Sequence, residues 1–364
     1  MEGVEKMTLK NFSNGKSVVL LTGNTGYIGT IMTRMLKERS FSVVGFDIGW
    51  FEHNNFFHIS DSSKPDRQIV KDIREISEDD LEGIDAVIHL AGLSNDPLGE
   101  INSGITDEIN CLATFKLAEL CKKRGISRFI FASSCSIYGI SSSEDFITEE
   151  GVLSPLTSYA KAKVEAEKAL TRLADGNFHP VFMRNATVYG VSPRLRLDLV
   201  VNNLTAWAYL TGEIAIKSDG TPWRPIVHIE DFCGAFVAAL KAPADMVHCE
   251  AFNVGIGEEN YRVKEIAFEV QKKIPGSKVR ILNETGGDER SYKVDFSKIR
   301  RTLPDFEPGW NLGRGISELL EAYARHNLTL DDFNSGRYFR IKTIKSFMDS
   351  GRMDERLLFR GGAR

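Results

Sequence analysis

The strongest constraint on the fold is a glycine-rich turn between an apolar run and an amphipathic segment. Residues 18–21 are Val-Val-Leu-Leu, and Gly23, Gly26 and Gly29 follow at intervals of three. A short apolar run of this kind is typical of a parallel strand that is buried on both faces. The glycines allow a tight bend, close approach of the backbone to a phosphate, and close packing of the next helix. We therefore expect a strand, a turn and a helix whose N-terminus binds a phosphate group.

Asp47 follows a second apolar run, residues 41–46. Its distance from the turn is close to the spacing of about 20 residues at which an acidic residue binds the ribose of a dinucleotide. A carboxylate would repel a 2′-phosphate, and residues 48–51 contain no arginine or lysine to bind one. The sequence therefore favours NAD over NADP. The alternative is that Asp47 is only a turn residue at the end of a strand.

Two further strands are expected between Asp47 and the helix expected at residues 105–123. Residues 68–73 form a short strand near whose end Asp72 is expected to accept a hydrogen bond from the adenine amino group. The alternative is that this acid is only a turn or capping residue. Residues 86–90 form the next strand, and the small residues after it allow a cofactor to come close. His89 lies within that strand, and we expect it to be a packed core residue.

The remaining elements complete a recognisable alternation of strands and helices. Residues 105–123 have the apolar spacing of a helix, and residues 128–132 form another apolar run. This order is typical of an α/β fold with a Rossmann-type, doubly wound parallel sheet and ligands at the carboxyl ends of the strands. The expected division is a NAD-binding domain over residues 1–190 with returning segments near 225–255, a smaller C-terminal substrate lobe over 191–330, and a helical tail over 331–364.

Composition argues against several other classes of protein. The 364 residues carry a formal net charge of −4, so no general basic surface for nucleic acid is expected. The five cysteines are odd in number and form no CxxC pair, so we expect neither disulfides nor a metal site, and a cytoplasmic location fits. The first sixteen residues lack the apolar segment of a signal peptide. No run approaches the roughly 18 apolar residues of a membrane span, so no membrane partner is expected.

Tyr159 and Lys163 are four residues apart in an expected helix, so their side chains lie on one face. A tyrosine titrates near pH 10, and lowering its pKa to about 7 requires about 4 kcal/mol. One positive charge at about 4 Å supplies about this amount at an effective dielectric constant of about 20. The pair is therefore a candidate for acid/base chemistry. The alternative is a chance pair on an exposed helix.

Four motifs together carry a resemblance to one family. They are Gly23-x-x-Gly26-x-x-Gly29, Asp47, Ser134 before Tyr138-Gly139, and Tyr159-x-x-x-Lys163. With them the chain resembles the extended short-chain dehydrogenase/reductase family, in its nucleotide-sugar epimerase and dehydratase branch, over residues 16–324. The resemblance implies that Tyr159 is the acid/base for a sugar hydroxyl, and that Lys163 lowers the pKa of this phenol and holds the nicotinamide ribose. It also implies that Ser134 hydrogen-bonds the reacting oxygen.

The resemblance also implies the residues that contact each ligand. The implied NAD contacts are Gly23, Gly26, Tyr27, Ile28, Gly29, Asp47, Asp72, Ile73, Leu90, Ala91, Gly92, Tyr159 and Lys163. Arg224 and Arg290, the latter in a late loop at 288–295, are the expected clamps for a nucleotide diphosphate, because a guanidinium donates two parallel hydrogen bonds. The full set of implied substrate contacts is Ser94, Ser134, Thr187, Arg194, Asn203, Arg224 and Arg290. Thr187 stands where the family usually has asparagine.

The chain also departs from some members of this branch. Where dehydratases carry Thr-Asp-Glu, this sequence reads Ser134-Cys135-Ser136. Elimination of water needs an additional acid and base, so this difference argues against dehydration. Relatives that act at carbons 3 and 5 often place a cysteine base two residues after the serine, at the position of Ser136. We therefore expect Cys135 to be a packing residue.

These observations leave a ranked set of hypotheses. The first is a NAD-dependent epimerase of a nucleotide-diphosphate sugar that acts by transient oxidation at C4. A C4 dehydrogenase and a 4-ketoreductase use the same groups and are alternatives, and a NAD-binding redox sensor without catalysis is an alternative of another class. The resemblance also implies a homodimer that pairs the helices at 105–123 and 159–174. The tail helix is expected to pack on the body through Tyr338, Ile341, Ile344 and Met348.

Overall fold

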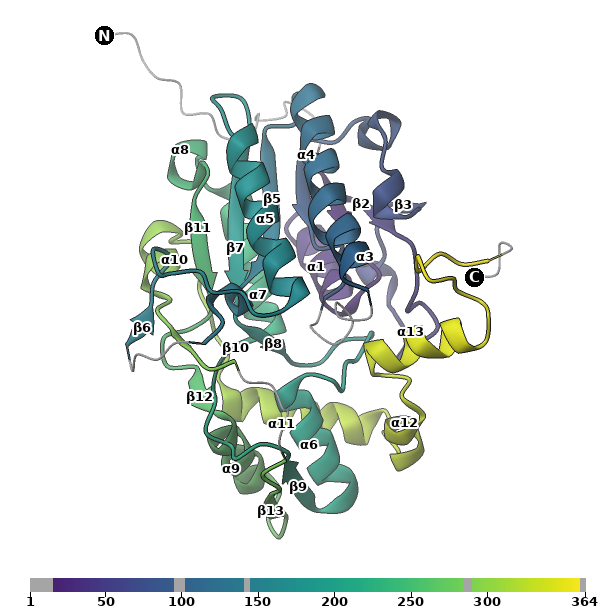
Figure 1. Cartoon of the computed structure of the whole chain (residues 1–364), viewed down its shortest axis with the longest axis vertical. Coiled ribbons are helices and arrows are strands. Elements are labelled where there is room, and N and C mark those ends of the chain that lie inside the picture. The colour runs from purple at the N-terminus through teal and green to yellow at the C-terminus, as the bar shows by residue number, and fades with distance from the viewer. Residues whose placement is uncertain (1–15, 95–101, 141–144, 285–289, 361–364) are drawn as a thin grey trace.

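The computed structural model describes residues 16–94, 102–140, 145–284 and 290–360. At its centre lies a seven-stranded sheet in the order β11-β7-β5-β4-β1-β2-β3, in which each of these strand pairs is parallel (Figure 1). Its strands are β1 Val18–Thr22, β2 Ser42–Asp47, β3 Arg67–Val70, β4 Ala86–His89, β5 Arg128–Ser134, β7 His179–Asn185 and β11 Ala251–Val254. The strand order reverses beside β1, which is where ligands bind in doubly wound sheets. The predicted Rossmann-type sheet is confirmed.

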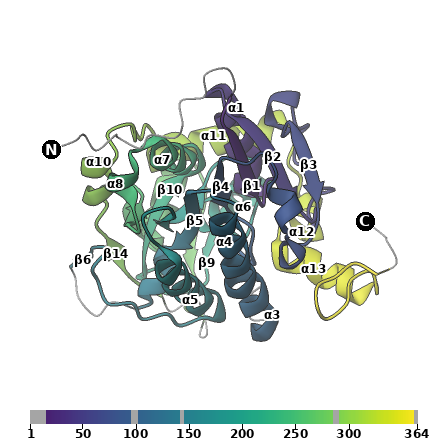
Figure 2. The ribbon, with the colours of Figure 1, turned by 90° about the horizontal axis from the view of Figure 1, so that it is seen from above.

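Helices cover both faces of this sheet (Figures 1 and 2). Helices α1 (Tyr27–Glu38) and α7 (Ile229–Lys241) pack on one face. Helices α4 (Ala113–Lys123) and α5 (Ser158–Leu173) pack on the other. Because both faces are covered, inner strands such as β1 and β5 are apolar on both sides, which explains their apolar runs, whereas the edge strand β3 is mostly exposed.

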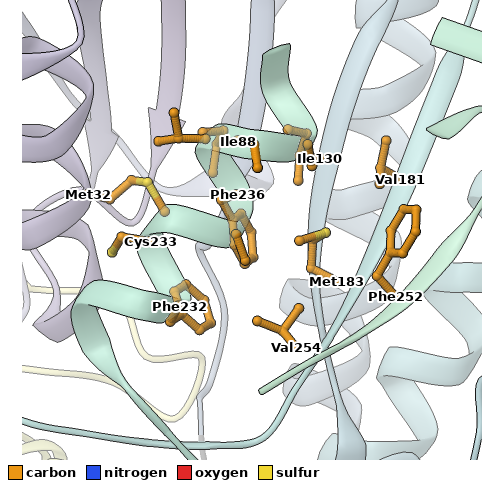
Figure 3. Close-up of a cluster of buried hydrophobic side chains, with 14 of the residues drawn as sticks. Met32, Ile88, Ile130, Val181, Met183, Phe232, Cys233, Phe236, Phe252 and Val254 are labelled. Carbon is orange, nitrogen blue, oxygen red and sulfur yellow. The ribbon is translucent and has the colours of Figure 1, made fainter. Parts of the chain in front are cut away.

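Successive residues of one strand enter opposite cores. Leu21 of β1 packs in the core under α1 and α7, whereas its neighbour Leu20 packs in the core under α4 and α5, and both are fully buried. Figure 3 shows the first of these cores, where Phe232 and Phe236 of α7 lie beside Met183 of β7. This alternation follows from the two-residue period of side chains along a strand.

A smaller lobe lies below the carboxyl ends of the strands in Figure 1. Its core lies between three helices and two small sheets of two and three strands. The lobe elements are β8 Thr187–Tyr189, α6 Val200–Thr211, β9 Glu213–Ile216, β10 Trp223–His228, β12 Asn260–Arg262, α9 Val263–Lys273, β13 Lys278–Ile281 and α11 Leu312–Arg325. Between β10 and β12 the chain returns to the main domain through α7 and β11. The remaining short pieces are β6 Phe146–Ile147, which pairs with β14 Lys293–Val294, and helices α8 Ala244–Val247 and α10 Ser297–Thr302.

The C-terminal tail packs against both parts of the molecule. It contains α12 (Leu330–Ser335) and α13 (Arg340–Asp349). Tyr338 is buried in the core of the lobe, and Ile344 is buried in the core under α4 and α5. Ile341 and Met348, from the same expected face, are partly buried. The tail thus bridges two apolar cores rather than extending into solvent.

Two boundaries differ from expectation for local reasons. The predicted strand at 68–73 ends at Val70, because the Asp72 carboxylate accepts a hydrogen bond from the backbone N–H of Arg74 at 2.8 Å and caps a short 3₁₀ helix. The predicted helix at 105–123 begins earlier, where the Asn102 side chain caps α3 (Ser103–Asp107). A π-helical turn, Glu108–Leu112, then joins α3 to α4.

Candidate active site

The glycine turn has the geometry of a phosphate cradle. Gly23 adopts a φ of +74°, which favours glycine, and its carbonyl accepts from Gly26 N at 3.1 Å. A Cβ on Gly29 would lie only 2.1 Å from Gly23 O, so no side chain fits there. Helix α1 begins at Tyr27 behind a glycine N-cap, which leaves its first N–H groups facing the turn. This arrangement suits the diphosphate of a dinucleotide.

A cavity runs from this turn along the carboxyl ends of β1, β2 and β4. The expected NAD contacts that line it are Gly23, Gly26, Tyr27, Ile28, Gly29, Asp47, Asp72, Ile73, Leu90, Ala91 and Gly92. The Asp47 carboxylate lies at the end of β2 and accepts from Thr25 N at 3.1 Å and from Gly49 N at 2.8 Å. These bonds fix the acid beside the turn, where a ribose would lie. The residues present therefore fit NAD.

Asp72 is more constrained than expected. Its two carboxylate oxygens accept from the Arg74 guanidinium at 3.0 and 2.7 Å. The acid still lines the cavity, next to Ile73. Any bond to an adenine amino group would use the lone pairs that Arg74 leaves available.

A second, larger cleft of about 770 Å³ adjoins the first and contains the three expected catalytic residues. Ser134 ends β5, and Tyr159 and Lys163 lie in the first turns of α5. The Lys163 Nζ lies 5.7 Å from the centroid of the Tyr159 ring and 4.6 Å from that of Phe131. The two cavities share Tyr27, Ile28, Leu90, Gly92, Ser94 and Arg196. A cofactor in the first cavity can therefore reach the second.

The electrostatics of Lys163 favour an acid/base role for its neighbour. Burial lowers the pKa of the Lys163 ammonium to about 8, and the charge of Glu167 opposes this shift. The group therefore remains mostly protonated at pH 7. A buried positive charge this close to Tyr159 stabilises the phenolate over the phenol.

A buried ion pair between Arg184 and Glu167 holds helix α5 against the sheet. The Arg184 guanidinium of β7 donates to both oxygens of Glu167, with a shortest distance of 2.7 Å. The Ser133 hydroxyl donates to the same carboxylate. Because Glu167 lies one turn after Lys163, this pair ties α5 to the two strands that end at the cleft.

The opposite wall of the cleft comes from the lobe. Thr187, Arg224 and Arg290 all line it, as expected for substrate contacts. Arg224 donates to the carbonyl of Trp223 at 2.8 Å and to the carbonyl of Arg290, which holds the two guanidinium-bearing segments together. Asp288 and Glu289 of the expected late loop lie outside the described residues. Ser94 lies where the two cavities meet and accepts from Arg196 at 3.3 Å.

Two of the expected substrate residues, Arg194 and Asn203, line neither of these two cavities. Arg194 is buried and donates to Thr25 O at 3.0 Å and to Glu52 O, so it braces the glycine turn. Asn203 donates to Leu197 O at 2.6 Å and stabilises the start of α6. The arginine of this segment that lines both cavities is Arg196, which pairs with Asp198 at 2.9 Å. The sequence contains no feature that distinguishes Arg196 from Arg194, since the two residues lie two positions apart in one irregular segment.

His89 and Cys135, which were expected to be packing groups, are both buried, and neither lines the two cavities. His89 hydrogen-bonds Thr22 at 2.7 Å and Thr114 at 2.9 Å, and burial lowers the pKa of its imidazole to about 3. The Cys135 thiol donates to Arg184 O, and burial raises its pKa well above the usual range. Neither group is positioned as a base.

The fold and the cleft together define a class: a Rossmann-type, nicotinamide-dependent enzyme with a tyrosine–lysine pair and a substrate lobe. Comparison with protein families makes this specific, because the model of the NAD dependent epimerase/dehydratase family matches residues 19–255. The chain belongs to this family. It is therefore an enzyme of the extended short-chain dehydrogenase/reductase type, and its cofactor is NAD.

Individual relatives resemble the chain over most of its length. A UDP-glucose 4-epimerase of Bacillus subtilis is 28% identical over 344 residues, covering 83% of this chain and 94% of the relative. A UDP-glucuronate 4-epimerase of Thermodesulfobacterium geofontis is 26% identical, covering 85% and 97%. Among solved structures, MoeE5 in complex with UDP-glucuronic acid and NAD has a TM-score of 0.73 at 27% identity, covering 85% of this chain and 99% of that chain. TunA, an NDP-hexosamine 5,6-dehydratase, has a TM-score of 0.75 at 23% identity, which shows the shared fold.

Among the helices that the described residues form, none is both long enough and apolar enough to cross a bilayer.

Proposed function

We propose that this enzyme is a NAD-dependent epimerase that inverts C4 of a nucleotide-diphosphate sugar. The observation that carries this proposal is one cleft with Ser134, Tyr159 and Lys163 on its Rossmann wall and Arg224 and Arg290 on its lobe wall. The first three suit a sugar hydroxyl, and the two arginines suit a diphosphate. Relatives named as UDP-glucose and UDP-glucuronate 4-epimerases support a UDP-sugar as the substrate.

The residues of the cleft have distinct roles in this proposal. NAD held at the glycine turn and Asp47 would supply a hydride acceptor for oxidation at C4 and a hydride donor for reduction of the resulting ketone. Tyr159 removes the proton of the C4 hydroxyl during oxidation and gives it back during reduction. Lys163 keeps the phenol acidic, and Ser134 hydrogen-bonds the reacting oxygen. Inversion requires that the ketone present its other face, and a cleft of about 770 Å³ leaves room for the sugar to turn.

The residues after Ser134 favour epimerisation over dehydration. Elimination needs a further acid and base at the cleft, but Cys135 is fully buried and bonded to a backbone carbonyl. The Ser136 hydroxyl is also buried and has no hydrogen-bond partner among the described residues. Neither side chain lines the cleft, so this segment provides no second acid/base.

A C4 dehydrogenase and a 4-ketoreductase remain the alternatives within the enzyme class, since they use the same three residues. They differ in whether the ketone is released or received rather than reduced in place. A redox sensor that only binds NAD is the alternative of another class. Incubation of the purified protein with UDP-glucose, UDP-glucuronate and UDP-N-acetylglucosamine separates these functions. A C4 epimer supports the proposal, a 4-keto sugar supports an alternative enzyme, and no product with any sugar supports the sensor.

We also infer a homodimer and a cytoplasmic location. Leu112, on the helical segment expected to form the dimer, is 55% exposed although it is apolar, which suits a surface covered by a second copy. The five cysteines are free thiols and four are buried, which suits a reducing compartment. Light scattering at micromolar concentration tests the first inference, and a monomer mass would contradict it. Cell fractionation tests the second, and recovery outside the cytoplasm would contradict it.

A further inference from the structure

Arg340 forms part of the wall of the cofactor cavity, although it comes from the C-terminal tail. Helix α13 lies far beyond residues 19–255, the segment that the family model matches. Figures 1 and 2 both place it, in yellow, at the β3 edge of the molecule. The cavity wall that Arg340 joins also contains Gly26 and Asp47. The tail therefore completes a site whose other walls come from the Rossmann domain and the segment around Arg196.

The position of Arg340 is set by how α13 docks. Ile344 of this helix is fully buried in the sheet core. Thr343 Oγ1 accepts from the Asn54 side chain at 3.1 Å. The Arg340 guanidinium carbon lies 3.7 Å from the centroid of the Phe51 ring. Both Phe51 and Asn54 belong to the segment that follows the ribose-binding acid, so the tail is fastened directly to the cofactor site.

Among the described residues, the Arg340 guanidinium has no hydrogen-bond acceptor. The residue is only 4% exposed, yet its side chain makes no hydrogen bond and no ion pair with any residue that the structure describes. The two nearby arginines are satisfied, because Arg194 donates to Thr25 O and Arg196 pairs with Asp198. Its nitrogen atoms are not fully enclosed, so N–H donors without a partner among the described residues can reach the cavity. The cavity is therefore arranged for a ligand that accepts hydrogen bonds.

The charge balance of the cavity points to an anion. The acids on its wall are already engaged: Asp47 by the backbone N–H groups of Thr25 and Gly49, and Asp72 by the Arg74 guanidinium. Burial lowers the pKa of Arg340 to about 9, the charges of Arg196 and Arg194 add to this shift, and the charges of Asp198 and Asp47 oppose it. Arg340 stays charged at neutral pH, and its positive charge has no bonded counter-ion among the described residues.

We propose that Arg340 clamps the diphosphate of NAD. The same cavity contains the glycine turn, where Rossmann domains bind the diphosphate, and a planar guanidinium donates two parallel hydrogen bonds to phosphate oxygens. A 2′-phosphate is the other anion that a dinucleotide could place near this wall, but Asp47 would repel it. The inference rests on the cofactor of the family and does not depend on the sugar.

Calorimetric binding of ADP-ribose and of adenosine to the full-length protein, freed of co-purified nucleotide, tests this proposal. In Arg340→Gln we expect ADP-ribose affinity to fall about 10- to 100-fold, because a charge-assisted contact is lost. Adenosine affinity should stay within about twofold, because adenosine has no diphosphate. Arg340→Lys keeps the charge without the planar fork and should lose about 3- to 10-fold for ADP-ribose. Lys345→Gln, which removes one exposed charge from the same helix, should match the wild type for both ligands.

Four results would overturn the proposal. Unchanged ADP-ribose affinity in Arg340→Gln would show that Arg340 does not bind the diphosphate. An equal loss of adenosine affinity would show that Arg340 contacts the nucleoside instead. Preferential NADP binding that Arg340→Gln abolishes would assign the residue to a 2′-phosphate. If Arg340→Gln shows no cooperative thermal transition, Arg340→Lys carries the test, and wild-type ADP-ribose affinity in that variant contradicts the proposal. No sugar is used, so a failure of the proposed epimerisation leaves this result interpretable.

Discussion

The Lys163 Nζ donates a hydrogen bond of 2.7 Å to the carbonyl oxygen of Ala132. This bond joins the first turns of α5 to the end of β5, two residues before Ser134. One strand end therefore positions both Lys163, which we propose lowers the pKa of Tyr159, and Ser134, which we propose holds the reacting oxygen. The catalytic geometry depends on the docking of α5 as much as on the residues themselves.

Tyr159→Phe tests the acid/base role. It removes one hydroxyl and little surface, so turnover should fall by about 100-fold or more while NAD affinity changes by less than about 1 kcal/mol. Steady-state rates with a turned-over UDP-sugar and calorimetry with NAD measure the two effects. Tyr209→Phe, at a partly exposed tyrosine in α6, should leave both unchanged. Wild-type turnover by Tyr159→Phe would remove this residue from the chemistry.

The pH dependence of the rate should report on Lys163. Its folded-state pKa is lowered from 10.5 to about 8, so its positive charge is lost as pH rises through about 8, and kcat should fall there. Unfolding does not explain such a fall, because the unfolded chain binds more protons between pH 8 and 10.5, and this lysine's contribution to stability therefore rises with pH. Lys161→Met, at an exposed position on the same helix, should keep the same profile. A rate that is constant up to pH 10 would show that the lysine charge is not required.

Glu167→Gln should destabilise the fold strongly. The Arg184 guanidinium would keep its burial and lose its counter-charge, which costs about 3–5 kcal/mol. Replacing both partners by apolar residues, as in Glu167→Leu with Arg184→Met, should recover much of this loss. Urea unfolding gives the free energies, and Glu165→Gln on the exposed face of α5 should change them by less than about 0.5 kcal/mol. A near-neutral Glu167→Gln would mean that the pair does not support the helix.

His89 should make the protein less stable in acid. Its folded pKa is about 3 and its unfolded value is 6.5, so below pH 6.5 the unfolded chain binds the extra proton. Between pH 7 and pH 5 this linkage lowers the free energy of unfolding by about 2 kcal/mol. Denaturation of the wild type and His89→Gln at both pH values should show a smaller pH effect in the variant. His53→Gln, at an exposed histidine, should retain the wild-type pH effect.

Local sequence patterns predicted the fold and much of the cofactor cavity. The strand–turn–helix unit and the Tyr159–Lys163 pair are each set within one short segment, where spacing alone fixes geometry. The sheet followed from its apolar runs, because a strand buried on both faces has no polar side. The cofactor contacts that the family resemblance implies lie mainly at the glycine turn and the ends of those strands.

The arginines were harder to assign because their positions depend on distant segments. Arg194 and Arg196 occur two residues apart, yet one braces the loop after β2 and the other reaches both cavities. Arg340 lines the cofactor cavity because Ile344 anchors the tail in the core under α4 and α5. No local spacing encodes such placements, since each depends on how the chain returns to the Rossmann domain.

In the proposed reaction, hydride leaves C4 of the sugar and returns to it within one active site. The most direct test uses UDP-glucose, or the UDP-sugar that turns over, with deuterium at C4 of the sugar. We predict a C4 epimer that retains the deuterium at C4, with no net accumulation of NADH. Deuterium appearing in released NADH together with a 4-keto product, or no inversion at C4 of any nucleotide sugar, would contradict this mechanism.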